Sequence, residues 1–235
     1  MEDRVGSVHG FNRCPSLFSL INILSHKIKL VNSVSKPLIS YNENMTHTIA
    51  GLGNPGPEYE NTRHNTGRIF ALFFAKYANA KDFSFNKKLN ADTAEGAIGR
   101  EKFLIILPDT YMNKSGNAIK PLVTSAKKAK NLIVVHDDLD IPFGKFKISF
   151  GKNSGGHKGV ESVMRAIKTK HFTRVRVGIS PKKKPSGEKN VEKLILGRFT
   201  PAETAELKKL SKKINQALEI TIKEGCQKAA SQINS

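Results

Sequence analysis

The sequence is poor in cysteine, in aromatic residues and in long apolar runs. Its 235 residues include two cysteines, Cys14 and Cys226, and neither lies in a C-x-x-C or Cys/His spacing that would hold a metal. Tryptophan is absent and aromatic residues make up 7%, which argues against a base-stacking sheet of the kind that binds single-stranded RNA. Because no run of about 18 apolar residues occurs, we expect a soluble protein without a membrane-spanning helix.

Acidic residues are scarce in the second half of the chain. The protein carries 39 Lys and Arg against 20 Asp and Glu, a net charge of +19. Residues 1–119 contain 14 basic and 10 acidic residues, whereas residues 120–235 contain 25 and 10. A strong positive field in one half of a fold favours nucleic acid as the partner, with a solvated lysine surface that serves solubility as the alternative.

Strand-like and helix-like patterns alternate from residue 46 onward. Continuous apolar runs at 103–107 and 132–135 are typical of strands covered on both faces. An apolar stripe at helical spacing runs along residues 202–224. The other expected strands are 46–52, 143–150 and 175–179, and the other expected helices are 67–79, 115–128 and 159–168. This order predicts a single-domain α/β sandwich.

Residues 1–45 differ in composition and pattern from the rest, and we interpret them as an N-terminal extension that is disordered or not translated. Met45 immediately precedes the first expected strand, so translation could begin there. A mitochondrial presequence is the alternative, but Glu2 and Asp3 argue against it because such peptides avoid acidic residues. Residues 46–235 then form the one expected domain.

The first strand leads into Gly51-Leu52-Gly53-Asn54-Pro55-Gly56, which satisfies the G-x-G-x-x-G pattern of dinucleotide-binding loops. In such loops the helix begins inside the glycine motif, so that its free amides face the pyrophosphate. Here Pro55 and Pro57 remove two amide donors, and the first helix is expected about ten residues later. The stretch therefore predicts a tight turn that presents Asn54 at the carboxyl end of a strand, and not a cofactor site.

Four polar loops follow strands or precede helices, and they carry His64, Asn113, Asp137 and His157 in turn. If the loops converge, they form a pocket with imidazole, carboxylate, amide and lysine groups. An imidazole oriented by a carboxylate is the minimal machinery for activating water, and amide side chains can stabilise an oxyanion. The implied reaction is acyl transfer to water, although each residue taken singly also has a structural explanation such as capping.

Two rival chemistries fit the residues less well. A serine nucleophile requires a G-x-S-x-G elbow, and neither Ser115 nor Ser154 lies in one. The run His136-Asp137-Asp138-x-Asp140, with His64 and His157, could supply ligands to a divalent metal. No H-x-x-x-H or H-E-x-x-H spacing occurs, so the sequence favours a metal-free site.

Several long motifs occur along the chain in series. They are GLGNPGPEY from Gly51, TRHNTG from Thr62, YMNKSG from Tyr111, HDDLDIP from His136, GGHKG from Gly155 and RVRVGI from Arg174. In this combination the chain resembles the bacterial-type peptidyl-tRNA hydrolases, from residue 46 to the end. The resemblance implies a single three-layer α/β/α globule with a central mixed, mostly parallel sheet and a C-terminal amphipathic helix, and it implies a monomer.

The resemblance also implies an activity. That activity is hydrolysis of the ester between a peptide and the terminal ribose of tRNA, without metal or cofactor, which recycles tRNA after aborted translation. By resemblance, His64 is the general base, Asp137 is the carboxylate that supports it, and Asn54 helps to select N-blocked substrates. Substrate contacts are implied for Tyr59, Tyr111 and Asn113.

One position departs from the family pattern. Lys158 follows the histidine of GGHKG, where the family commonly has an asparagine that contacts substrate. A lysine accepts no hydrogen bond but binds phosphate or a carbonyl oxygen as a point charge, so we keep it among the expected substrate contacts. The basic second half is expected to hold the acceptor stem of peptidyl-tRNA, with no contact to DNA or membrane. Its named candidates are Lys145, Lys147, Arg174, Arg176 and the lysines of the last helix.

The expected location is the cytoplasm, or the mitochondrial matrix if residues 1–44 act as a presequence. A non-catalytic RNA-binding protein is the alternative function, since chloroplast relatives of the family serve in intron splicing. The presence of His64, Asp137, Asn54 and Asn113 together argues against this alternative.

Overall fold

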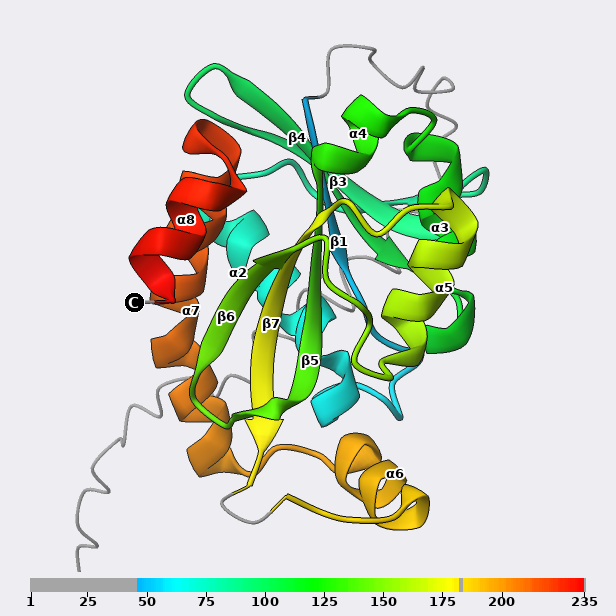
Figure 1. The fold of residues 1–235 in the computed structure, drawn as a ribbon, viewed down its shortest axis with the longest axis vertical. Coiled ribbons are helices and arrows are strands. Elements are labelled where there is room, and N and C mark those ends of the chain that lie inside the picture. The colour runs from blue at the N-terminus through cyan, green and yellow to red at the C-terminus, as the bar shows by residue number, and fades with distance from the viewer. Residues whose placement is uncertain (1–45, 182–183, 235) are drawn as a thin grey trace, which may run out of the picture. The chain divides into compact units, whose positions relative to one another are not determined.

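The computed structural model describes residues 46–181 and 184–234, which all belong to one unit of the chain (Figure 1). The interpretation of residues 1–45 as an extension or presequence lies outside the described residues. None of the described helices is long and apolar enough to cross a membrane.

A seven-stranded sheet forms the centre of the fold, in the order β2-β3-β4-β1-β5-β7-β6. The four middle strands β4, β1, β5 and β7 run parallel, and the outer pairings are antiparallel. The prediction of a mixed α/β sheet is confirmed, and its parallel part is the middle of the sheet. The strands are β1 (His47–Gly51), β2 (Ser84–Asn86), β3 (Ala91–Ile98), β4 (Glu101–Pro108), β5 (Leu132–Pro142), β6 (Phe146–Phe150) and β7 (Thr173–Ser180).

Helices cover both faces of this sheet and bury a separate apolar core on each (Figure 1). On one face, α2 (Thr66–Tyr77) and α7 (Pro201–Glu224) pack on Ile49, Ile105 and Val175. On the other face, α3 (Gly116–Ile119), α4 (Ala126–Lys130) and α5 (Lys158–Ile167) pack on Ala50, Ile106 and Val134, which alternate with residues of the first core along β1, β4 and β5. This alternation explains the continuous apolar runs, because both faces of each central strand are buried.

The long terminal helix is confirmed, whereas the single helix expected over 115–128 is wrong. The 3-10 helix η2 (Met112–Lys114) leads into α3, and a second 3-10 turn η3 (Lys120–Leu122) ends it. Pro121 cannot continue the hydrogen-bonded ladder, and Ser125 caps the new helix α4 through the amide of Lys128. The predictions also missed the β2–β3 hairpin and two short helices, α6 (Glu188–Leu196) and α8 (Cys226–Ile233).

The contact of α2 with the sheet depends on a glycine. A Cβ atom on Gly67 would lie 2.2 Å from the carbonyl oxygen of Val135 and 2.5 Å from the backbone nitrogen of Leu52. The amide of Arg68 donates to the carbonyl of Leu52, and the amide of Leu52 donates to the carbonyl of Val135. The start of α2 therefore rests directly on the backbone that follows β1 and on the first half of β5.

We predict that Gly67→Ala lowers the free energy of unfolding by about 1–3 kcal/mol, although alanine is the better helix former, because the added methyl forces backbone apart. Denaturant unfolding measures the change. The control is Lys76→Ala at an exposed position of the same helix, which should alter stability by less than about 0.5 kcal/mol. Equal stability of Gly67→Ala and the wild type would contradict the close approach.

Candidate active site

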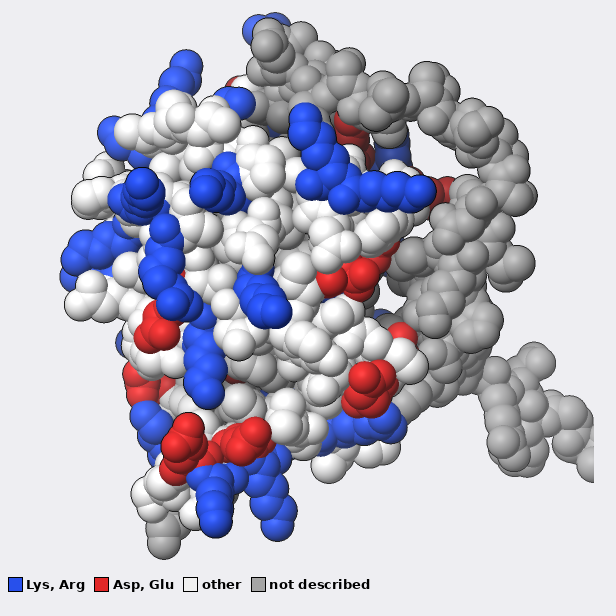
Figure 2. All heavy atoms as spheres, turned by 90° about the vertical axis from the view of Figure 1, so that its right-hand side faces the viewer, with Lys and Arg blue, Asp and Glu red and all other residues white. Residues whose placement is uncertain are grey.

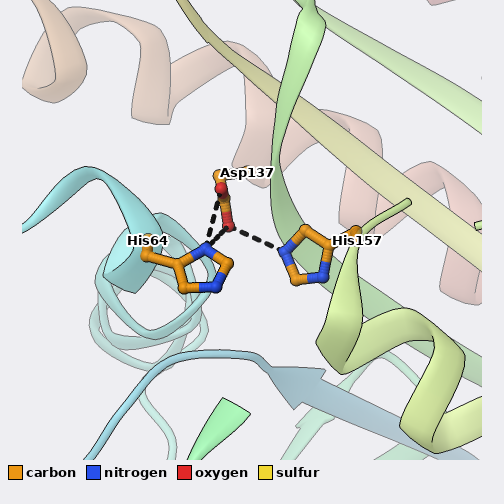
Figure 3. Close-up of side chains that lie close together, drawn as sticks. All are labelled: His64, Asp137 and His157. Atoms are coloured by element: carbon orange, nitrogen blue, oxygen red, sulfur yellow. Dashed lines mark hydrogen bonds and ion pairs between the residues drawn. The ribbon is translucent and has the colours of Figure 1, made fainter. Parts of the chain in front are cut away.

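A carboxylate and two imidazoles meet beside the middle of β5, and Asp137 lies within this strand, not in the polar loop expected over 136–140 (Figure 3). The Asp137 oxygens both lie 3.0 Å from Nδ1 of His64, and Oδ1 also lies 2.9 Å from Nε2 of His157. All three side chains have little exposure, and Asp137 is 3% exposed. In this dry surrounding each hydrogen bond to the carboxylate is stronger than it would be in water.

Three different elements supply these side chains. Asp137 belongs to the last part of β5 that pairs regularly with β7 before the register shifts. His64 lies in the 3-10 turn η1 (Arg63–Asn65), directly before α2. His157 is the N-cap of α5. The site is therefore built where strand ends and helix starts converge, which is the usual place for ligand-contacting groups in open α/β sheets.

The backbone before His64 is anchored to a distant part of the chain. The amide of Arg63 donates to the carbonyl of Gly197, and its guanidinium donates to the carbonyl of Arg198 at 2.7 Å. The same guanidinium pairs with Glu203 at 2.5 Å, in the first turn of α7. Because α2 holds the other side of His64, the imidazole is fixed from both directions along the chain.

The two histidines differ in which of their ring nitrogens are occupied by hydrogen bonds. Nδ1 of His157 accepts from the amides of Gly159 at 3.1 Å and Val160 at 3.3 Å, so its proton lies on Nε2 and is donated to Asp137. His64 donates from Nδ1 to the same carboxylate, and its Nε2 has no hydrogen-bond partner among the described residues. Only His64 thus keeps an unoccupied lone pair that can take a proton from water.

Burial and charge act in opposite directions on the titration of this site. Burial by itself would lower the pKa of His64, but the charge and hydrogen bonds of Asp137 outweigh it and raise that pKa above its ordinary value. The Lys158 charge opposes this rise. Burial would raise the pKa of Asp137, and the two histidines outweigh it, so the carboxyl pKa lies far below its ordinary value. Asp137 is therefore ionised throughout the range in which His64 titrates.

Asn54 lies next to this cluster with a fixed amide orientation. Its Oδ1 accepts from the amide of Met112 at 2.8 Å, and its backbone is held in both directions by the side chain of Asn65. With Oδ1 occupied, the Nδ2 group of Asn54 donates to no described residue. The turn itself lies just downstream, where the amide of Tyr59 donates to the carbonyl of Gly56, and Asn54 keeps, in the segment before it, an N–H donor that is free among the described residues.

Three of the other four predicted substrate contacts are exposed. Tyr111 is 59% exposed and precedes η2, which carries the exposed Asn113. Lys158 is the exposed first residue of α5, and Tyr59 is half-buried in the turn before His64. Lys158 directly follows His157 in the chain, and none of the four side chains hydrogen-bonds to His64, Asp137 or His157 within the described residues.

The residues of the metal alternative converge only in part. His64, Asp137 and His157 offer ligand atoms within 4.8 Å of one another, the geometry that a cation requires. Each nitrogen that faces this space already hydrogen-bonds the carboxylate, so a metal would have to displace those protons. Asp138 and Asp140 point elsewhere, to Arg176 and Lys184. The arrangement fits a carboxylate with two imidazole donors better than a ligand set.

His157 is the site residue that sequence reasoning underestimated. It was expected among metal ligands and within a motif, but without a role beside Asp137. The available signal was its position at the start of a helix after two glycines, where a side chain that accepts from helix amides is required.

Comparison with known proteins agrees with the geometry. A family profile described as "Peptidyl-tRNA hydrolase" matches residues 48–235. A protein of that name from Mycobacterium tuberculosis (strain H37Rv) is 39% identical over 188 residues, which cover 80% of this chain and 96% of the relative. The chain belongs to the peptidyl-tRNA hydrolase family. Another member, from Syntrophotalea carbinolica, is 35% identical over 194 residues.

Solved structures of the peptidyl-tRNA hydrolase family share the fold. The Acinetobacter baumannii enzyme superposes with a TM-score of 0.73 at 27% identity, over 83% of this chain and 98% of that chain. A peptidyl-tRNA hydrolase crystallised with N-propanol gives the same TM-score at 28% identity. The predicted family and the predicted α/β fold are therefore both confirmed.

We predict that the His64 imidazole titrates above the ordinary value of about 6.5 in the wild type and below it in Asp137→Asn, where burial acts without the opposing charge. Titration of the imidazole signals by NMR measures both. His47, at the far end of β1, serves as the internal control and should keep its pKa in the variant. An unchanged His64 titration in Asp137→Asn would contradict the proposed charge coupling.

Proposed function

We propose that this protein hydrolyses the ester bond between a peptide and the terminal ribose of tRNA. The observation that carries the proposal is the buried Asp137, which orients His64 and leaves its Nε2 open. Family membership and the names of the relatives support the same substrate class. The products are a peptide with a free carboxylate and a tRNA with a free terminal hydroxyl.

In the proposed reaction, Nε2 of His64 takes a proton from water as the water oxygen bonds to the ester carbonyl carbon. Asp137 stabilises the resulting imidazolium, and the proton passes to the ribose oxygen as the ester bond breaks. The Nδ2 group of Asn54 is a suitable donor to a carbonyl oxygen of the N-blocked peptide or to the developing oxyanion. His157 is a positioning residue in this scheme, because both of its nitrogens are occupied.

Fewer basic residues are free to contact tRNA phosphates than the sequence suggested. Lys145 and Lys147 are exposed and available to phosphates. Arg174, in contrast, is 2% exposed and donates to the carbonyls of Asn153 and Ser154, which argues against its expected phosphate contact. Arg176 pairs with Asp138 at 2.7 Å, which partly neutralises it. We assign acceptor-stem binding to the exposed Lys145 and Lys147. We propose that Tyr59, Tyr111, Asn113 and Lys158 contact the end of the substrate that carries the ester.

We further propose a monomer that acts where translation occurs. This is the cytoplasm, or the mitochondrial matrix if residues 1–44 serve as a presequence. No helix of the described residues spans a membrane, and the relatives compared above are bacterial.

We expect His64→Asn to lower kcat for N-acetyl-aminoacyl-tRNA by about 10²–10⁴-fold with little change in KM, because the general base is lost while the binding groups stay. Release of N-acetyl-amino acid measures the rate. Activity of the wild type should be unaffected by a chelator, and loss in chelator with recovery in divalent metal would favour the metal alternative. Tight tRNA binding without ester cleavage by the wild type would favour the non-catalytic RNA-binding alternative.

We expect Lys158→Asn to move the acidic limb of the kcat/KM pH profile to higher pH. Removal of the positive charge raises the pKa of His64, and the base is active only when neutral. The matched control is Lys152→Asn, an exposed lysine in the preceding loop that has no ion-pair partner among the described residues, and its profile should stay unchanged. A limb that moves to lower pH in Lys158→Asn would contradict this role.

A further inference from the structure

A cavity surrounded by lysines lies at the end of the sheet opposite the His64–Asp137–His157 cluster. A cavity of about 350 Å³ opens between α4 and the loop that joins α5 to β7. Lys130 precedes β5 and Thr169 and His171 precede β7, so the cavity lies at the amino ends of these parallel strands. Its polar lining residues are Thr124, Ser125, Lys130, Lys168, Thr169 and His171, with no acidic side chain among the lining residues.

The positive charge around this cavity is not neutralised by the protein. Lys127, Lys128, Lys130 and Lys168 are exposed, and none has an ion-pair partner within the described residues. Residues 110–136 contain no Asp or Glu. Some lysines elsewhere are paired, as in Lys81–Glu95 and Lys223–Glu219. Figure 2 shows the face of the molecule that lies on the right in Figure 1, and the charged side chains in its upper left part are predominantly Lys and Arg.

We propose that this cavity binds a backbone phosphate of the tRNA substrate at a distance from the ester. The inference rests on the proposed function. Helix α5 joins the two sites, with Lys158 at its start and Lys168 just after its end, and its ten residues span about 15 Å. A substrate that places its ester at His64 thus extends its backbone over this face. Ammonium, imidazole and hydroxyl groups are all donors to phosphate oxygens.

A polyanion fits this site better than a single small anion. The unpaired lysines of α4 lie on the surface beside the cavity, so one phosphate inside would leave most of their charge uncompensated. A nucleic acid backbone presents phosphates at regular intervals and neutralises several lysines together, releasing their counterions. Contacts of this kind position the whole tRNA without reading its sequence.

The test uses the full chain and two substrates of different size. The double variant Lys130→Gln/Lys168→Asn removes both charges, and asparagine tolerates the left-handed backbone of residue 168, whose φ is 54°. Kinetics are measured with N-acetyl-aminoacyl-tRNA and with the same acyl group on a short CCA oligonucleotide, at several salt concentrations. We expect KM for the tRNA to rise about tenfold and the slope of log kcat/KM against log salt to become shallower by about 2. The kcat value and both constants for the short substrate should stay unchanged.

The matched control is Lys87→Gln/Lys88→Gln, two exposed lysines in the turn between β2 and β3, at one edge of the sheet. An unchanged KM for tRNA in the cavity variant, an equal rise with the short substrate, or an equal rise in the Lys87/Lys88 control would each overturn the proposal. If the wild type cleaves neither substrate, the proposed function fails. The affinity for tRNA is then measured directly at the same salt concentrations, and the cavity proposal requires about tenfold weaker binding by the cavity variant than by the wild type.

Discussion

One buried carboxylate organises the functional end of this molecule. Asp137 is 3% exposed, and an unpaired charge at such a depth would cost several kcal/mol. Donors from two other elements compensate it: Nδ1 of His64 before α2 and Nε2 of His157 at the start of α5. The same interactions that make the charge tolerable therefore fix the relative positions of β5, η1 and α5.

The two histidines are chemically unequal because of what lies behind each ring. The helix amides behind His157 occupy its remaining nitrogen, whereas the remaining nitrogen of His64 has no described partner. A fully buried third histidine, His136, packs edge-on against His157 with ring centroids 4.7 Å apart, and burial lowers its pKa well below the ordinary value. It therefore stays neutral and adds no competing charge to the cluster.

The sequence predicted more of the site than of the peripheral fold. Asn54 follows a strand and His64 precedes a helix that strong local signals define, whereas Asp137, expected in a loop after the apolar run 132–135, lies within the longer strand β5. The β2–β3 hairpin was missed because its segments lack a continuous apolar run: β3 consists mostly of small and polar residues, as Ala91-Asp92-Thr93-Ala94 illustrates. The break after α3 depends on one proline and one capping serine within an otherwise helical pattern.

The sequence by itself determined the family, the alternation of strands and helices, and the candidate residues, because these depend on local periodicity and on motifs that are contiguous in the chain. Only the tertiary structure decided which of these side chains are engaged within the protein and which are free to meet a substrate. It committed Arg174 to two loop carbonyls, assigned His157 to Asp137, and gathered Lys130 and Lys168 around one cavity. Hydrogen-bond partners and electrostatic neighbours come from segments far apart in the chain, and no local pattern records which of them a side chain will meet.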